Sequence, residues 1–226
     1  RSDYGSAPSA KRPRGAEFKS GEVHSAHGYL LHQFLSPLSN TRNDAYGGDL
    51  AGRMRFPLRV IEAVRAAWPE TLPVFVRISA VDGMDGGWTM ADSLAFARAM
   101  KPLGVDVVDC SSGGIGGSAT WSKRIPRGYG FQLPYAAEIR RDTGLASMAV
   151  GLIIGPHQAE AALEAGEADL IAIGREAMNN PNWALMARGI LDPGTTEEVF
   201  ACWPPQHGWW MEKRAAVMEA LGAPPA

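Results

Sequence analysis

Short apolar runs alternate with amphipathic segments along most of the chain, and this alternation limits the possible folds more than any other feature. Residues 73–79 are almost continuously apolar, as expected for a strand that is buried on both faces of a parallel sheet. Residues 52–67 instead carry apolar side chains at helical spacing, and Asp49 is a suitable N-cap before them. Strands that alternate with helices predict right-handed crossovers and a parallel sheet.

The same reading gives a full set of expected elements. Strands are predicted at 21–24, 73–79, 105–110, 147–150 and 168–173, with helices at 52–67, 90–103, 134–142 and 156–165. Helical turns are predicted at 175–178 and 181–189, a helix at 211–221, and a long loop at 25–50. Residues 1–21 are expected to form an irregular leader, and residues 22–226 one barrel-type domain.

Two α/β architectures fit this order, an open doubly wound sheet and a (β/α)8 TIM barrel. A GxGxxG motif is missing after the first predicted strand, which argues against a dinucleotide-binding sheet. Residues suited to function follow almost every strand, as in a barrel. A complete barrel needs eight strand–helix units and roughly 200 residues or more. We therefore predict about the last five units of a TIM barrel, with the other strands supplied upstream or missing from a fragment.

Composition argues against several classes of partner. The chain has 226 residues, 46% hydrophobic and 20% charged, and a net charge of -2, so neither nucleic acid nor a membrane is an expected partner. The basic run at 11–14 is interpreted as a solvated tail. Cys110 and Cys202 form no CxxC pair, which predicts no metal site and no disulfide framework. Without a signal segment, we expect a cytoplasmic protein.

A pair of histidines follows the first predicted strand. His24 and His27 are three positions apart, so in a straight strand they would point to opposite faces. They converge only if the strand ends near His24 and the chain turns, which Gly28 favours. Two imidazole donors could then hold one carbonyl oxygen, and Tyr29 could supply a proton. The alternative is two loop histidines with ordinary hydrogen bonds; His32 is interpreted as a surface residue.

Glycines after the last two predicted strands indicate a phosphate site. Gly151 follows the strand at 147–150, and Gly174 and Arg175 follow the strand at 168–173. Loops after the last two strands of a barrel frequently bind phosphate, and Arg offers a two-pronged donor to its oxygens. The alternative is two glycine-terminated strands with a surface arginine. A barrel lyase or isomerase with a phosphorylated substrate would use the same site.

Three other features leave alternatives open. Arg77 lies within an apolar strand, so it either forms a structural ion pair or faces a ligand. Cys110 is more consistent with a small buried side chain than with a nucleophile. The tail tryptophans either anchor an interface or pack on the barrel; they are Trp203, Trp209 and Trp210.

Several strings in the chain together resemble the Old Yellow Enzyme family, and within it the NADPH dehydrogenase and xenobiotic reductase branch. HSAHGYLL stands at 24–31, FLSPLSNTRNDAYGG at 34–48 and RMRF at 53–56. FVRISA at 75–80, DCSSGG at 109–114, AVG at 149–151 and IGR at 173–175 continue the likeness in order. The resemblance covers about residues 22–212.

The resemblance implies a function and a set of site residues. FMN would take a hydride from NADPH or NADH and pass it to the activated C=C of an α,β-unsaturated carbonyl or nitro compound. His24 and His27 would bind the activating group, and Tyr29 would donate the proton. Arg77 would lie beside the flavin pyrimidine ring. Three residues would hold the FMN phosphate: Gly151, Gly174 and Arg175.

The resemblance also implies a homo-oligomer, because the C-terminal segment of this branch reaches a neighbouring active site. The competing interpretation is a catalytically incompetent barrel fragment or assembly subunit that retains the phosphate loop. Such a chain would lack the upstream strands that carry further flavin contacts in the family.

Overall fold

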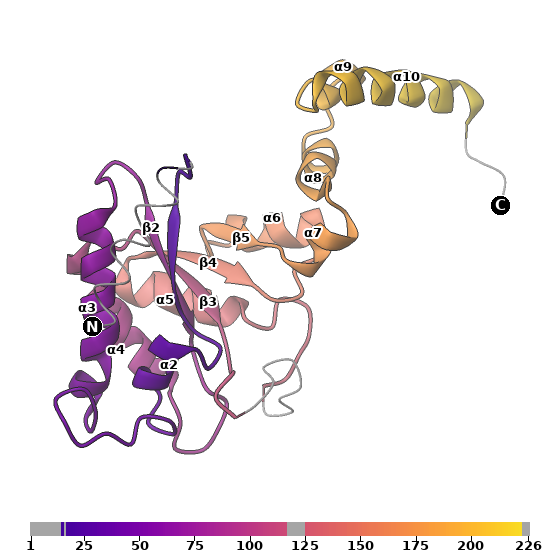
Figure 1. The fold of residues 1–226 in the computed structure, drawn as a ribbon. Coiled ribbons are helices and arrows are strands. Elements are labelled where there is room, and N and C mark those ends of the chain that lie inside the picture. The colour runs from indigo at the N-terminus through magenta and orange to yellow at the C-terminus, as the bar shows by residue number, and fades with distance from the viewer. Residues whose placement is uncertain (1–14, 16, 117–124, 223–226) are drawn as a thin grey trace. The chain divides into compact units, whose positions relative to one another are not determined.

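The computed structural model describes residue 15, residues 17–116 and residues 125–222 (Figure 1). Its strands are β1 (Gly21–Ser25), β2 (Val74–Ser79), β3 (Val107–Ser111), β4 (Ala146–Val150) and β5 (Leu170–Ala172). Its helices are α2 (Leu30–Leu35), α3 (Leu50–Ala67), α4 (Met90–Met100), η1 (Lys101–Leu103), α5 (Leu133–Thr143), α6 (Pro156–Glu164), α7 (Arg175–Asn179), α8 (Trp183–Leu191), α9 (Thr196–Phe200) and α10 (Pro205–Leu221). The basic run at 11–14 and most of the predicted leader lie outside the described residues.

The five described strands form one parallel sheet in chain order, β1-β2-β3-β4-β5. The register aligns His24 with Arg77, and Arg77 with Asp109. Helices connect consecutive parallel neighbours, which is the repeated βαβ arrangement that the sequence predicts. The α/β class and the parallel sheet are thus confirmed.

The chain divides into two compact units. The first comprises Arg1–Ile153 and Ala162–Ala172, and it contains the whole sheet together with α2, α3, α4 and α5. The second comprises Ile154–Ala161 and Ile173–Ala226, and it contains the helices α7 to α10. The histidine pair and Arg77 therefore belong to the first unit, whereas Gly174 and Arg175 belong to the second.

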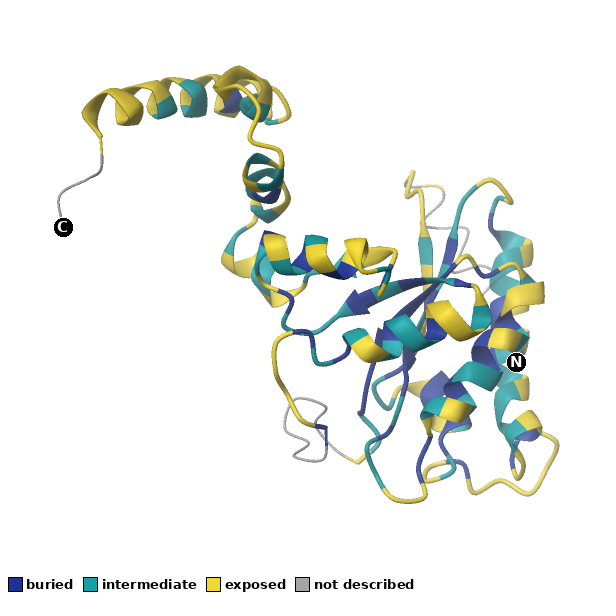
Figure 2. Cartoon of the chain, turned by 180° about the vertical axis from the view of Figure 1, so that it is seen from behind, coloured by how far each residue is buried: buried dark blue, intermediate teal, exposed yellow. Residues whose placement is uncertain are grey.

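One face of the sheet forms the core of the first unit. Figure 1 shows α3, α4 and α5 on one side of the strands, and Figure 2 shows buried residues along the strands and on the facing sides of these helices. In β2, Val74, Val76 and Ile78 are fully buried and alternate with half-buried Phe75 and Arg77. Since strand side chains alternate in direction, the opposite face carries the chemistry-bearing residues.

Local sequence signals explain where the main helices begin. The Asp49 side chain accepts a hydrogen bond of 2.8 Å from the Gly52 backbone N–H, which confirms Asp49 as the N-cap of α3. Helix α4 begins with a capping box in which Thr89 and Asp92 satisfy each other's backbone N–H groups. The buried side of these helices then packs against the sheet.

Three helical segments differ from the sequence prediction. Residues 25–50 were expected to form a loop, but they contain α2, whose six residues are too few to display a clear helical period. Helix α10 begins at Pro205 rather than at 211, since proline is well tolerated in the first helical turn. Helix α9, which begins with its own capping box, was not predicted.

Among the described residues, no helix is both long and apolar enough to cross a membrane.

The Asp49 cap gives a test of how α3 begins. We expect Asp49→Ala to lower the free energy of unfolding by about 1 kcal/mol, because the Gly52 N–H loses its acceptor. Asp49→Asn is the matched control, since it keeps a side-chain oxygen at the same place. Urea unfolding of both variants checks this, and an equal loss in the two would contradict the cap.

Candidate active site

A tight turn with left-handed backbone follows β1. His27 has φ 58° and Gly28 has φ 77°. A Cβ on Gly28 would lie 2.5 Å from the Gly114 carbonyl oxygen, so this position accepts only glycine. At His27 the left-handed conformation costs about 1–2 kcal/mol, and the surroundings must therefore hold it.

Each of the four backbone N–H groups in this turn, residues 26–29, has a defined acceptor. The acceptors are His24 Nδ1 for Ala26 at 3.3 Å, Ser79 Oγ for His27 at 3.0 Å, His32 Nδ1 for Gly28 at 2.9 Å and the Ala26 carbonyl for Tyr29 at 3.2 Å. Two of these acceptors are imidazole nitrogens and one is a hydroxyl on β2. The turn is thus fixed by side chains as well as by backbone.

The turn brings the three predicted catalytic side chains together. The ring centroids of His24 and His27 are 5.2 Å apart, with the planes at 64°. The ring of Tyr29 lies 5.2 Å from that of His24 in an edge-to-face arrangement, and Tyr29 is 65% exposed. The strand ends and the chain turns where the spacing of the histidines requires it. The catalytic roles of the three residues remain predictions.

Both imidazoles are held in the neutral form. Burial and the positive charge of Arg77 lower the pKa of His24 below its usual range. Burial, Arg77 and His24 together lower the pKa of His27 to about 4. Each ring therefore carries one N–H at neutral pH. Because Nδ1 of His24 accepts the Ala26 N–H, the proton of His24 lies on Nε2.

The other end of the His27 ring meets β3. His27 Nε2 lies 2.6 Å from Ser111 Oγ. The Ser111 hydroxyl is also 3.4 Å from Gln132 Oε1, and the Gln132 amide donates to the Val150 carbonyl at 2.9 Å. His27 is thus connected through Ser111 and Gln132 to the end of β4.

Sequence reasoning did not assign Ser79, Ser111 or Gln132 to the site. Ser79 and Ser111 end neighbouring strands, β2 and β3, and both hydroxyls contact His27. The available signal was the position of the DCSSGG string at the carboxyl end of a strand, where barrel proteins place their functional residues. Small hydroxyl residues are common in such loops, so their type alone did not identify them.

Arg77 takes part in a cluster with two carboxyl groups. Its Nε lies 3.2 Å from Asp109 Oδ2, so the structural ion pair of the two alternatives is present. Burial raises the pKa of Asp109 to about 7, with Arg77 opposing and Glu22 reinforcing the rise. Burial also raises the pKa of Glu22, and the neighbouring Arg77 and Asp109 oppose that rise. The side chain of Arg77 is still 27% exposed, and its contact with a flavin stays a prediction.

The residues predicted to hold phosphate are divided between the two units. Gly151 follows β4 with φ 117°, and a Cβ there would lie 2.8 Å from a ring carbon of Phe131. Gly174 is the N-cap of α7, and Arg175 begins that helix as an exposed residue. Each segment has its predicted position after a strand, and the common phosphate site stays a prediction.

Three further sequence interpretations concern Cys110, metal ligands and His32. Cys110 is fully buried, and burial raises the pKa of its thiol far above the usual range, as suits a small core side chain. Within the described ranges, no group of three or more His, Cys, Asp or Glu side chains could hold a metal ion. His32, predicted to be a surface residue, is instead fully buried, and that prediction is wrong.

Together, the fold and the site define a class: an α/β protein of the parallel-barrel type, with a polar site where its strands end. Residues 2–191 match the model of the NADH:flavin oxidoreductase / NADH oxidase family. The chain belongs to this family, and its resemblance to the Old Yellow Enzymes is confirmed.

Bacterial NADPH dehydrogenases are among the similar proteins. That of Geobacillus thermodenitrificans is 47% identical over 178 residues, which cover 79% of this chain and 50% of the relative. That of Bacillus subtilis is 45% identical over 178 residues, with 79% and 51% covered. The chain thus spans about half the length of the curated relatives that it matches.

Solved structures agree on the fold. A 2-naphthoyl-CoA reductase complex superposes with a TM-score of 0.75 at 22% identity, covering 89% of this chain and 30% of that one. An old yellow enzyme homologue from Zymomonas mobilis gives a TM-score of 0.64 at 24% identity, covering 84% and 50%. These likenesses confirm the barrel-type fold, of which this chain contains a part.

The lowered pKa of His27 predicts a pH-dependent stability. Below the ordinary pKa of 6.5, His27 is protonated in the unfolded chain. In the folded chain it stays neutral until the pH falls to its lowered pKa of about 4. The free energy of unfolding should therefore decrease as the pH drops from 6.5 to about 4. This decrease should be smaller in His27→Gln, which lacks the imidazole. Urea unfolding above and within this window measures the difference. His157→Gln, at an exposed histidine, is the control; equal behaviour of the two variants would contradict the assignment.

Proposed function

We propose that this chain carries the substrate-binding half of an FMN-dependent ene-reductase. In this reaction a hydride from NAD(P)H reaches the activated C=C of an α,β-unsaturated carbonyl or nitro compound. The observation that carries the proposal is the neutral imidazole pair with its adjacent tyrosine, at the carboxyl end of β1. Membership of a flavin oxidoreductase family supports it.

The side chains and glycines proposed to hold FMN have the chemistry that this cofactor needs. Arg77 lies beside His24 in the sheet register, is partly exposed, and presents a guanidinium to the same face of the strands. Such a cation suits the electron-rich pyrimidine edge of a flavin. Gly151, Gly174 and Arg175 are the proposed phosphate contacts, each at the residue that the family pattern requires. When bound, FMN supplies the hydride chemistry.

The protein side chains hold and polarise the substrate. His24 would donate its Nε2–H to the carbonyl or nitro oxygen, since its Nδ1 is occupied by the Ala26 N–H. In the tautomer in which Ser111 gives its one hydroxyl proton to Nε2 of His27 rather than to Gln132 Oε1, the ring proton of His27 lies on Nδ1 and would be the second donor. Two such donors stabilise the negative charge that develops on the oxygen.

Tyr29 would supply the proton to the α-carbon. Its ring packs edge-on against that of His24, which supports a place for Tyr29 beside the substrate that His24 would bind. The side chain is exposed, and solvent can therefore replace the proton after each turnover. General acid catalysis of this kind needs a positioned donor more than a shifted pKa.

The alternative is a catalytically incompetent barrel fragment or an assembly subunit. It is supported by the match, which covers only about half of the relatives' length, and by the polar face of the sheet, where Arg77 is only half-buried. A subunit of this kind would complete its barrel with another chain.

Titration with FMN and NADPH separates these two functions. We expect the purified chain to bind FMN, to lose the yellow flavin absorbance on anaerobic addition of NADPH, and to regain it with an α,β-unsaturated ketone. A chain that is colourless once unbound FMN has been removed by gel filtration would contradict the enzyme and favour the fragment.

Variants of the site test the roles of the side chains. We expect His24→Ala to lower kcat/KM for an enone by about a hundred-fold, through loss of one oxyanion donor. Tyr29→Phe should lower the ratio of enone-dependent to oxygen-dependent NADPH consumption by about a hundred-fold, since only the alkene needs a carbon-bound proton. Steady-state kinetics with both acceptors measure this. An unchanged ratio in Tyr29→Phe would rule out its role as proton donor.

A homo-oligomer belongs to the same proposal. In the second unit, Trp209 and Trp210 of α10 are 50% and 66% exposed, and large exposed aromatic residues are enriched at interfaces. We expect light scattering to give at least a dimer, and Trp210→Ala to shift it towards the monomer. A monomer in the unaltered chain would contradict this part of the proposal.

A further inference from the structure

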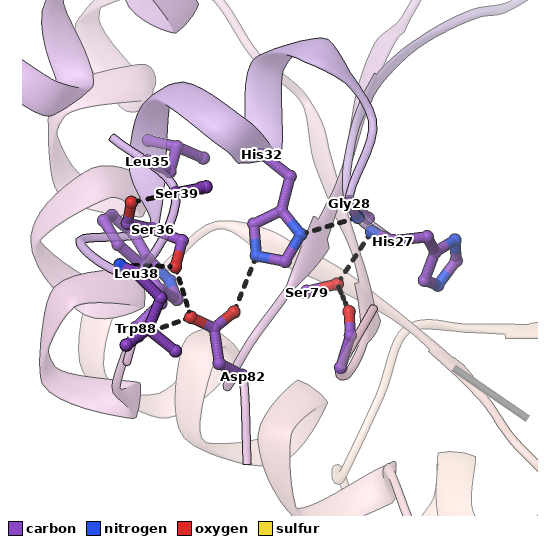
Figure 3. A network of polar contacts seen from close by, with 12 residues as sticks. His27, Gly28, His32, Leu35, Ser36, Leu38, Ser39, Ser79, Asp82 and Trp88 are labelled. Atoms are coloured by element: carbon purple, nitrogen blue, oxygen red, sulfur yellow. Dashed lines mark hydrogen bonds and ion pairs between the residues drawn. The ribbon is translucent and has the colours of Figure 1, made fainter. Parts of the chain in front are cut away.

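A buried His–Asp pair lies directly behind the histidine turn. His32 Nε2 is 2.9 Å from Asp82 Oδ1, and both side chains have no exposed surface. His32 belongs to α2, whereas Asp82 follows β2 in the chain. Figure 3 shows the His32 ring between Asp82 on one side and the backbone of Gly28 on the other.

Asp82 has polar neighbours at both of its carboxylate oxygens. Its second oxygen, Oδ2, accepts the Ser36 hydroxyl at 2.6 Å and the Trp88 backbone N–H at 2.8 Å (Figure 3). Burial pushes the pKa of Asp82 upward, but hydrogen bonds from His32, Ser36 and Trp88 bring it below its ordinary value. The carboxylate is therefore a fixed, ionised acceptor that anchors the imidazole.

The other nitrogen of His32 holds the turn. Nδ1 accepts the Gly28 N–H at 2.9 Å, so the ring proton lies on Nε2, the nitrogen that is 2.9 Å from Asp82 Oδ1. One tautomer and one ring orientation satisfy both contacts at once. A series of polar contacts with a fixed direction thus runs from Asp82 through His32 to the backbone N–H of Gly28, between His27 and Tyr29.

We propose that His32 and Asp82 are positioning residues that set the geometry of the paired imidazoles. The inference rests on the proposed function, because it assigns the pair a role in substrate alignment. The left-handed conformation of His27 and Gly28 is unfavourable by itself, and the acceptor on Gly28 helps to hold it. A displacement of about 1 Å in a reacting group can lower a rate about a hundred-fold.

Two matched substitutions separate positioning from plain core stability. His32→Asn leaves a side-chain oxygen near the place of Nδ1, so the Gly28 N–H keeps an acceptor. His32→Gln leaves an amide near the place of Nε2, so Asp82 keeps its donor but Gly28 loses its acceptor. Both remove the ring and disturb packing to a similar degree. If positioning is the role, the glutamine variant is the more damaging of the two at the site.

The first readout is NMR of the chain itself, without cofactor. In the unaltered chain we expect ¹⁵N signals of a His32 ring protonated on Nε2. His32→Gln should shift the Gly28 amide signal and the ring signals of His24 and His27, and His32→Asn should shift them less. Asp82→Asn cannot satisfy all three donors, so it should also shift the Gly28, His24 and His27 signals. This variant provides the test if a His32 variant does not fold. Ile139→Ala, in the buried core, controls for general loss of stability.

The second readout is kinetic and uses the FMN-loaded chain. We expect kcat for an enone to fall at least about ten-fold in His32→Gln, with less effect in His32→Asn and in Ile139→Ala. The proposal is overturned if the Gly28, His24 and His27 signals of His32→Gln match those of the unaltered chain while only its melting temperature falls. Failure of the unaltered chain to reduce any alkene would overturn the proposed function, whereas the NMR comparison would still decide the role of His32.

Discussion

The close crossing of two backbones at Gly28 and Gly114 is the constraint on which the site depends. A Cβ on Gly114 would lie 2.4 Å from the His27 Cα, so the loop after β3 and the turn after β1 pack directly against each other. This contact and the hydrogen bonds that Ser79 and His32 accept from the turn hold His27 in a left-handed conformation that it would not adopt alone. The convergence of the two imidazoles is therefore a property of the packed sheet, not of the local sequence.

Charge arrangement on the same face of the sheet suits the proposed chemistry. Arg77 lies next to His24 in the register, and its positive charge helps to keep both imidazoles neutral. Neutral rings donate one N–H each without placing a second cation beside a flavin. Asp109, with its raised pKa, lies at the level of Arg77 in the register and pairs with it, and Glu22 lies two residues before His24 on β1.

Much of this was predictable from sequence, for identifiable reasons. Continuous apolar strands, helical spacing and the Asp49 cap are local signals, and they gave the parallel sheet and its helices. The turn after His24 followed from the period of a strand. His32 was misjudged because residues 25–50 were expected to be a loop. Once α2 is known to be a helix, Leu31, His32 and Leu35 share its buried face. The partner Asp82 comes from a distant segment, and only the fold reveals it.

The central claim is that His24 and His27 together hold one substrate oxygen. The most direct test is to titrate the FMN-loaded chain, labelled with ¹⁵N in its histidines, with a simple enone. We predict that the ring signals of both residues shift with one common dissociation constant, while those of the exposed His157 stay unchanged. Signals that move for only one of the two histidines, or for neither, would contradict the account.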